Sequence, residues 1–443
     1  MVDPLAHADS VAALQKLLAV TETDIQTQKE VLLALERWRS NIQRRLNALR
    51  DPIARIPVEI SAEIFTHYAP NYGTEYASVA KPLLLLRICS RWTEIAVATP
   101  RLWANLDLQI PREVCPNFVF YLDRWLARSK NFPLSLSISD GLEDHFDILN
   151  VVTAHAHHIR ELDMRLESYM ALFSRQTTFP LLEVVDVKRG RRYRASQIWT
   201  TNALGDMWQY APNLTSYKLQ MGSIMPPSAP SMERTYMQET LTSLTIIEDA
   251  HSSSSHVLSH FTLPSLTSLD VQISGKDLPA LISFVERSSP LLTVLCLTRY
   301  TLDDDLNYTP STIERLFRLL PAISSLELRD LAKLQDTLIS MLTCLPLTSF
   351  LPSLTEFTIT RRTPEWPSES SYKPIADMLK RRSEKLRVFS FDCGNYRSPE
   401  QPMPLPHKEE RAIFRKLSEG GMDIDLGVVM LEMYRWEPAD DDL

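Results

Sequence analysis

A short apolar pattern, Leu-x-x-Leu-x-Leu, recurs along most of the chain and constrains its fold more than any other feature. Clear copies are preceded by a Leu-Pro pair, as at Leu263, Leu320 and Leu351. The first apolar position of each copy stands at 159, 182, 214, 241, 266, 292, 323, 354 and 386, so neighbouring copies are 23 to 32 residues apart. A period of this length predicts a solenoid, in which each unit buries its apolar side against the next.

Each copy predicts a short β-strand, because its apolar residues alternate with polar ones. The predicted strands centre on residues 134–138, 159–164, 182–187, 214–219, 241–246, 263–271, 292–297, 320–328, 351–359 and 386–391. Helix-like segments at 276–286, 311–319 and 331–342 would cover the outer side of the array. The expected fold class is α/β or α+β with short parallel strands, and a general α/β domain with coincidental leucine spacing is the alternative.

Residues 11–49 carry a heptad pattern typical of a coiled coil. Nine of its twelve seam positions are apolar. The three polar seam residues, which would weaken a dimer, are Thr21, Gln28 and Arg39. Self-association and a single amphipathic helix lying on its own protein both fit this pattern. The pair Asp51-Pro52 ends the predicted helix, because proline cannot continue it.

The composition is that of a protein with a real core, with 44% hydrophobic and 23% charged residues. The net charge of −8 disfavours a nucleic-acid-binding surface, and the low count of 10 glycines disfavours Gly-rich phosphate loops. We see neither a signal peptide nor an apolar run long enough to span a membrane. The five cysteines are scattered without a CxxC pair, so reduced thiols in the cytoplasm or nucleus are expected.

Residues 55–106 predict three short helices between the heptads and the repeats. Pro57 suits the first turn of the first helix. The apolar face of that helix would consist of Ile60, Ile64, Phe65 and Tyr68. The second helix would be lined by Leu85, Ile88, Cys89, Trp92, Ile95 and Ala96, and the short third would run from Pro100 to Trp103. Three such helices bury little apolar surface, so a partner is expected to complete their burial.

This stretch resembles the F-box, whose pattern runs Leu-Pro-x-Glu-Ile, then Ile-Phe, then Val-Cys-x-x-Trp and Pro-x-Leu-Trp. The matching residues are Ile56, Pro57, Glu59, Ile60, Ile64, Phe65, Ile88, Cys89, Arg91, Trp92, Pro100, Leu102 and Trp103. The resemblance implies binding to the Skp-type adaptor of a cullin–RING ubiquitin ligase. The implied contact residues are Ile56, Pro57, Glu59, Ile60, Ile64, Phe65, Ile88, Trp92, Leu102 and Trp103. Ser61 and the long loop 70–82 depart from the family pattern, and an ordinary helical subdomain is the alternative.

The repeat copies resemble divergent leucine-rich repeats. The Asn that usually follows the last Leu is absent, so the side-chain ladder it makes is expected to be missing. Its place is taken by Ser274, Tyr300, Leu331, Arg362 and Gly394. The order of coil, F-box and repeats also resembles the F-box proteins common in mushroom-forming fungi.

Five regions are therefore expected. They are a coiled-coil-like helix at 1–50, the F-box at 51–108, a connecting helix at 109–130, the repeat domain at 131–430 and an acidic tail at 431–443. Loops are expected at 225–232, 249–260 and 403–407, and a final unit at 417–429 would cap the array.

The chain carries no motif for catalysis, so we expect no enzymatic activity, no cofactor and no metal. His155 and His158 form a candidate metal pair on a helix, but no further ligand is evident, and a polar helix end is the simpler interpretation. The basic run 188–194 is interpreted as a solvated loop, with an acidic partner or a nuclear signal as the alternative.

The sequence favours a substrate receptor of an SCF-type ubiquitin ligase, in which the F-box holds the adaptor and the repeats bind a protein target. The side chains between the buried leucines would line the exposed concave sheet, where we expect charges to contribute little to stability. The candidate target-binding residues are Asp163, Arg165, Lys188, Lys218, Asp270, Gln272, Glu327, Arg329 and Glu356. Such a polar face of mixed charge fits a protein surface better than an apolar ligand. The alternatives are a ligase-independent scaffold that self-associates through residues 11–49 and an enzyme with a repeat-borne site.

Overall fold

The structure is a computed structural model that describes residues 11–50, 52–68, 80–111, 113–139, 141–189, 205, 208–221, 235–248, 255–273, 277–299, 309–361, 372–392 and 406–427. The chain divides into two compact units. The first comprises residues 1–106 and 124–132, and the second comprises residues 107–123 and 133–443. The expected loops at 225–232 and 403–405, the basic residues 190–194 and the acidic tail lie outside the described residues.

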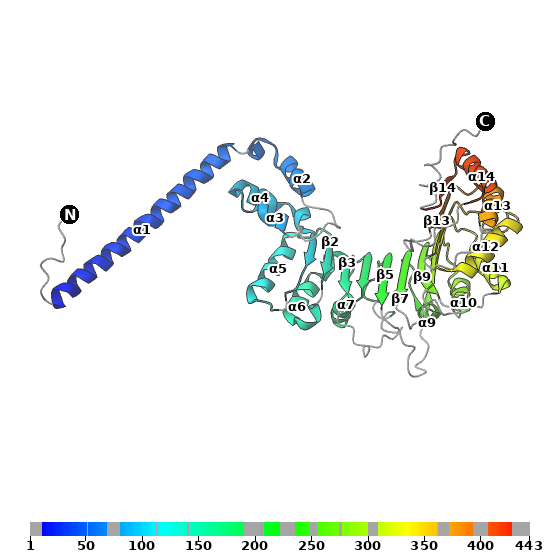
Figure 1. Cartoon of the computed structure of the whole chain (residues 1–443). Helices are drawn as coiled ribbons and strands as arrows, with labels where there is room; N and C mark the ends of the chain where they lie inside the picture. The colour runs from blue at the N-terminus through cyan, green and yellow to red at the C-terminus, as the bar shows by residue number, and fades with distance from the viewer. Residues whose placement is uncertain are drawn as a thin grey trace, which may run out of the picture. The chain divides into compact units, whose positions relative to one another are not determined.

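The first unit begins with one long helix, α1 (Val11–Arg50), as the heptad pattern predicts (Figure 1). The helix ends directly before Asp51-Pro52, where the sequence predicts its end. The short elements that follow are the 3-10 helix η2 (Pro52–Arg55), α2 (Val58–Tyr68), α3 (Ala80–Leu85), α4 (Ser90–Ala98) and the 3-10 helix η3 (Pro100–Trp103). We refer to residues 52–104 as the helical module.

The prediction of one continuous helix from Leu85 to Ala96 is wrong, because α3 ends at Leu85 and α4 begins only at Ser90. Cys89, directly before α4, has an extended backbone with φ −157° and ψ 169°. The hydroxyl of Thr93 donates to the carbonyl of Leu86 at 3.0 Å, which satisfies an acceptor between the two helices. The break therefore has its own hydrogen bond and turns the chain between two short helices.

The second unit is built on a parallel sheet whose twelve strands follow one another in chain order, apart from two short strands that pair separately (Figure 1). All ten predicted strands are present. The strands are β1 (Asn105–Leu108), β2 (Leu134–Ile138), β3 (Ile159–Arg165), β4 (Val184–Lys188), β5 (Ser216–Met221), β7 (Ser243–Glu248), β9 (Ser268–Ile273), β10 (Val294–Arg299), β11 (Ser325–Arg329), β12 (Glu356–Thr360), β13 (Val388–Asp392) and β14 (Asp423–Asp425). The separate pair consists of β6 (Tyr236–Met237) and β8 (Phe261–Thr262).

Helices occupy many of the connections between the strands, and α10 to α14 all lie against one face of the sheet (Figure 1). The helices are α5 (Pro116–Arg128), α6 (Phe146–Ala154), α7 (Leu166–Phe173), α9 (Ser255–His260), α10 (Leu278–Ser288), α11 (Pro310–Arg318), α12 (Ala332–Cys344), α13 (Tyr372–Arg382) and α14 (Lys408–Glu419), with the 3-10 helices η4 (Leu142–Asp144) and η5 (Ala156–His158). The three predicted outer helices correspond to α10, α11 and α12. The short helix α9 corrects the expectation that all of 249–260 is a loop.

Several strands begin two to five residues later than predicted, because the first apolar residue of the repeat lies in a turn. The N–H groups of Leu214, Leu266 and Ile323 each donate to the carbonyl three residues earlier, at 3.2, 3.3 and 3.4 Å. All three side chains are buried. The first leucine of the pattern therefore contributes to the core from the turn that precedes the strand.

A ladder of hydroxyl groups joins six consecutive repeats at this turn. In each repeat a Thr or Ser directly follows the first apolar residue, and its hydroxyl donates to a backbone carbonyl of the preceding repeat at 3.0 to 3.2 Å. The donors are Thr215, Thr242, Thr267, Thr293, Ser324 and Thr355. From Thr242 onward each acceptor belongs to the preceding donor residue, so the ladder continues through the array without a break.

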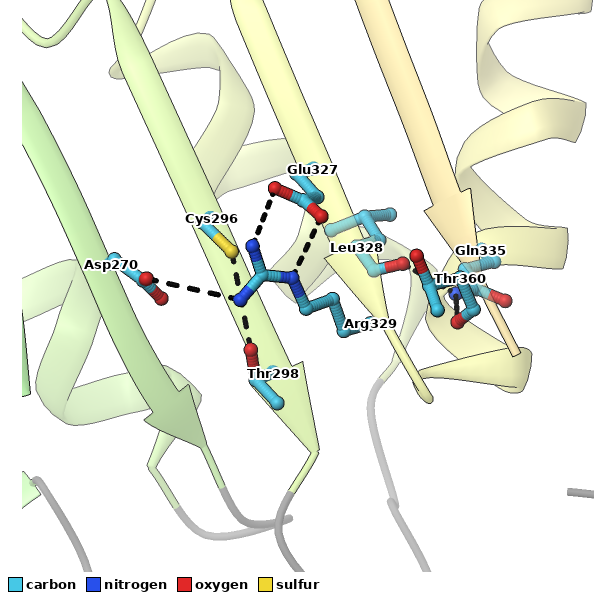
Figure 2. Close-up of polar contacts among 8 residues, drawn as sticks. All are labelled: Asp270, Cys296, Thr298, Glu327, Leu328, Arg329, Gln335 and Thr360. Carbon is cyan, nitrogen blue, oxygen red and sulfur yellow. Dashed lines mark hydrogen bonds and ion pairs between the residues drawn. The ribbon is translucent and has the colours of Figure 1, made fainter. Parts of the chain in front are cut away.

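One glutamine makes side-chain hydrogen bonds to the backbone near the strand ends, where the repeat pattern usually has an Asn that this chain lacks. Gln335 of α12 is buried, and its side-chain N–H group donates to the carbonyls of Leu328 and Thr360 at 2.9 and 3.3 Å (Figure 2). The buried Arg361 donates in turn from Nε to the Gln335 oxygen at 2.6 Å. The side-chain amide thus links the ends of β11 and β12 from the helical side of the sheet.

Candidate functional site

The helical module has a small core of its own around Trp103. The Trp103 indole N–H donates to the carbonyl of Ala96 at 2.8 Å, which fixes η3 against the last turn of α4. The Phe65 ring of α2 lies 4.8 Å from the Trp92 ring of α4, measured between centroids. An ion pair at 3.4 Å between Arg101 and Glu63 also joins η3 to α2. The short helices are therefore held together by a few specific contacts.

Apolar residues of the same module remain exposed to solvent. Ile60 and Ile64 on α2 are 53% and 46% exposed, and Ile88 between α3 and α4 is 50% exposed. Full burial of one such side chain against a partner would stabilise the complex by about 1.5–3 kcal/mol. The exposed apolar residues of the helical module are Val58, Ile60, Ile64, Tyr68, Leu83, Leu84, Ile88 and Val97.

The predicted adaptor-contact residues separate into two groups. Pro57, Glu59, Ile60, Ile64 and Ile88 are exposed, whereas Ile56 and Trp92 are half-buried. Phe65, Leu102 and Trp103 are at most 2% exposed, and the Trp103 ring lies 4.8 Å from the Trp125 ring of α5, so their expected role as contact residues is corrected to a role in the core. Ser61, which departs from the family pattern, is also buried and donates to the carbonyl of Pro57 at 3.1 Å.

The second candidate surface is the face of the sheet opposite α10–α14. Along most strands, buried apolar residues alternate with half-buried or exposed residues, and the positions of this face line up from strand to strand. We call one such line the central row. Its members, in register, are Ser137, Asp163, Asp186, Lys218, Thr245, Asp270, Cys296, Glu327, Thr358, Ser390 and Asp425. On β10 the residue at this position, Cys296, is buried. Two residues further along the strands, Gln272, Thr298, Arg329, Thr360 and Asp392 form a second row.

Acidic and basic residues pair with one another across β3, β4 and β5. Lys188 Nζ lies 2.6 Å from Asp163 Oδ2, and Lys218 Nζ lies 3.6 Å from Asp186 Oδ2. The other oxygen of Asp186 is shielded from solvent and accepts no hydrogen bond from any described residue. Burial raises the pKa of Asp186, and the neighbouring Lys218 opposes that rise.

A second charged cluster lies on β9, β10 and β11, with Arg329 at its centre (Figure 2). Glu327 accepts two hydrogen bonds from the Arg329 guanidinium, at 2.7 and 2.8 Å, and Asp270 lies 3.9 Å from the same group. The bidentate hydrogen bond with Glu327 raises the pKa of Arg329. Burial is the main cause that raises the pKa of Asp270 and, to a larger extent, the pKa of the Cys296 thiol between them. Cys296 is therefore a neutral, unreactive thiol at neutral pH.

All nine predicted target-binding residues lie on this face of the sheet. The expectation that their charges are simply exposed is corrected for Asp163, Asp270, Glu327 and Arg329, whose side chains are 25% to 35% exposed and are paired within the protein. Glu356 and Lys188 are exposed. A partner at this face would therefore meet charges that already have fixed positions.

Sequence reasoning placed Asp186 on this face beside Lys188, and its place in the central row confirms that prediction. It missed Cys296, which lies in the same row between Asp270 and Glu327. The signal was present, since Cys296 stands between two buried leucines of its strand, as its neighbours in the row stand between apolar residues of theirs. Four serines on the same face also escaped notice. They are Ser216, Ser243, Ser268 and Ser325.

The two histidines considered as a metal pair lie close together, with 5.4 Å between their ring centroids, but each also has another polar partner. His155 ends α6 and lies 3.3 Å from Asp123, whereas His158 belongs to η5 and contacts His157 at 3.0 Å. Burial lowers the pKa of His158 to about 4. Within the described ranges no three His, Cys, Asp or Glu residues are placed to hold a metal ion.

In the part of the chain that the structure describes, no helix combines the length and apolar character that crossing a membrane requires. Comparison with known proteins adds no relative: no protein-family model matches the chain, and no curated protein matches it significantly.

Proposed function

We propose that the protein is the substrate-receptor subunit of an SCF-type cullin–RING ubiquitin ligase. In this proposal the helical module is an F-box that binds the Skp-type adaptor, and the parallel array is a set of divergent leucine-rich repeats that binds a protein target. The chain itself performs no chemistry. It holds the target near the ligase and requires no cofactor.

The observation that carries the proposal is the division of apolar residues within the helical module. Trp103, Phe65 and Leu102 are buried, whereas Ile60, Ile64 and Ile88 of the same short segment are about half exposed to solvent. Those three match apolar positions of the F-box pattern. An exposed set of aliphatic anchors on a small helical scaffold is what a docking module presents to its partner.

The face of the sheet opposite α10–α14 supports the second half of the proposal. Its central row presents acidic, basic and small polar side chains at positions fixed by the strand register. Preorganised charges of both signs favour a partner with a complementary pattern and disfavour other partners. A protein or peptide target fits such a face.

Co-purification with the Skp-type adaptor tests the proposal. We expect Pro57→Ala combined with Ile60→Ala to abolish recovery of the adaptor, because buried aliphatic anchors often contribute about 2 kcal/mol or more to an interface. The matched control is Glu356→Lys on the sheet, which should leave adaptor recovery unchanged. Wild-type recovery with the double variant would refute the assignment.

A scaffold that self-associates through α1 is the second candidate, and the exposed heptad seam of that helix favours it. Leu18, Leu32 and Leu35 are all more than half exposed. Light scattering of the purified chain separates this candidate from the first, because Leu32→Asp with Leu35→Asp should convert a dimer to a monomer. A monomeric wild-type protein would remove the scaffold candidate and leave the adaptor proposal intact.

A further inference from the structure

We infer that α1 pairs with α1 of a second copy of this chain, and that the two helices run antiparallel. The inference rests on the self-association named above and is independent of adaptor binding. It starts from the exposure of the seam, whose apolar members are 38% to 76% exposed along the whole helix. At 1.5 Å per residue, the 40 residues of α1 provide a seam about 60 Å long.

The charge distribution along α1 favours the antiparallel arrangement. Residues 11–30 contain two lysines and three acidic residues, whereas residues 31–50 contain five arginines and one glutamate. A parallel pair would place the two arginine-rich halves side by side, and like charges at that distance repel. An antiparallel pair places each arginine-rich half beside the more acidic half of the partner helix.

The polar seam residues lead to the same arrangement. In a parallel, in-register coil each seam residue meets its own copy, so Arg39 would face Arg39. In an antiparallel coil whose two seams overlap fully, Val11 of one helix faces Leu49 of the other. The residue numbers of any two facing seam residues then add up to 60. Arg39 then faces Thr21, with the carboxylate of Glu22 at nearly the same height along the helix. The arginine thereby gains an acceptor in place of a like charge.

Distances between spin labels test the orientation in the full chain. The five native cysteines are changed to alanine, and single cysteines are introduced at Lys16, Glu30 or Arg44, which lie on the outer side of the coil. For the antiparallel pair we expect about 40 Å at Lys16 and at Arg44, and about 20 Å at Glu30, from 1.5 Å per residue and the helix diameter. About 20 Å at all three positions would mean a parallel pair and would overturn the inference, as would a monomer.

A charge exchange provides a second test that leaves the cysteines in place. Arg39→Glu should raise the dimer dissociation constant about tenfold, because the new carboxylate lies beside Glu22 of the partner helix. Adding Glu22→Arg should restore the affinity, as measured by sedimentation. Failure of the second change to rescue the first would overturn the antiparallel arrangement. Adaptor recovery with these variants reports separately on the proposed F-box function.

Discussion

The repeat array buries most of its apolar residues, whereas the helical module leaves several of its own exposed to solvent. In the twelve-stranded sheet each strand between β1 and β14 has a paired strand on both sides, and the leucines of neighbouring repeats are buried beside one another. In the helical module Ile60, Ile64 and Ile88 have no such neighbour and remain in solvent. A repeated unit is covered on both sides by neighbouring copies of itself, whereas a short unique segment has no such copies to cover its apolar side chains.

The strongest test of this contrast compares one core residue of the array with one exposed residue of the module. Phe357→Ala should destabilise the protein by about 3–5 kcal/mol, because Phe357 is fully buried and its ring lies 5.9 Å from that of Phe389. Ile60→Ala should change the free energy of unfolding by about 0.5 kcal/mol or less and reduce adaptor recovery instead. Chemical denaturation followed by circular dichroism measures both. Equal destabilisation by the two changes would break the contrast.

A second test asks whether the array also depends on buried polar bonds. Gln335→Leu should cost about 1–3 kcal/mol, because it removes the acceptor of the buried Arg361 and the donor to two backbone carbonyls. Asp336→Asn is the control, since Asp336 also contacts Arg361 but is 62% exposed. Stability is again measured by denaturation. A larger loss with Asp336→Asn than with Gln335→Leu would contradict this account of the buried network.

The hydroxyl ladder predicts a smaller effect. Thr267→Val keeps the shape of the side chain but removes its hydrogen bond to the carbonyl of Thr242, so we expect a loss of about 0.5–1.5 kcal/mol. Thr358→Val in the central row is the control, because the hydroxyl of Thr358 is not part of the ladder. Midpoints of thermal unfolding should fall for the first variant and not for the second. This result would strengthen the contrast between the array and the helical module, because the described residues of the module contain no hydrogen bond that repeats in this way.

The smallest expected effect concerns pH. Because burial raises the pKa of Asp270 above its ordinary value, the folded protein binds this proton more tightly than the unfolded chain does. The contribution of Asp270 to stability is therefore fully present at pH values below the pKa that Asp270 has in the unfolded chain. It is lost as the pH rises through the higher pKa that Asp270 has in the folded protein. Asp270→Asn should gain stability relative to wild type as pH increases from 4 to 7, measured as the difference between the two thermal midpoints. A difference that shrinks with rising pH would show that the pair with Arg329 outweighs burial.

The sequence alone placed every predicted strand, the long N-terminal helix and the nine charged or polar residues on one face of the sheet. These features are local, because alternation along a strand and heptad spacing along a helix determine which side of an element is apolar. The proline at 52 likewise ended α1 where the pattern predicts. Local chemistry was sufficient for each of these assignments.

The tertiary structure decided which of those residues meet. Asp270, Cys296 and Glu327 stand 26 and 31 residues apart in the chain, and only the strand register brings them into one row beside Arg329. The same holds for Gln335 and Arg361, and for the burial of Phe65, Leu102 and Trp103, which the resemblance to the F-box implies as contact residues. Periodicity specifies the face on which a side chain lies, whereas its partner depends on the packing of residues that are distant in the chain.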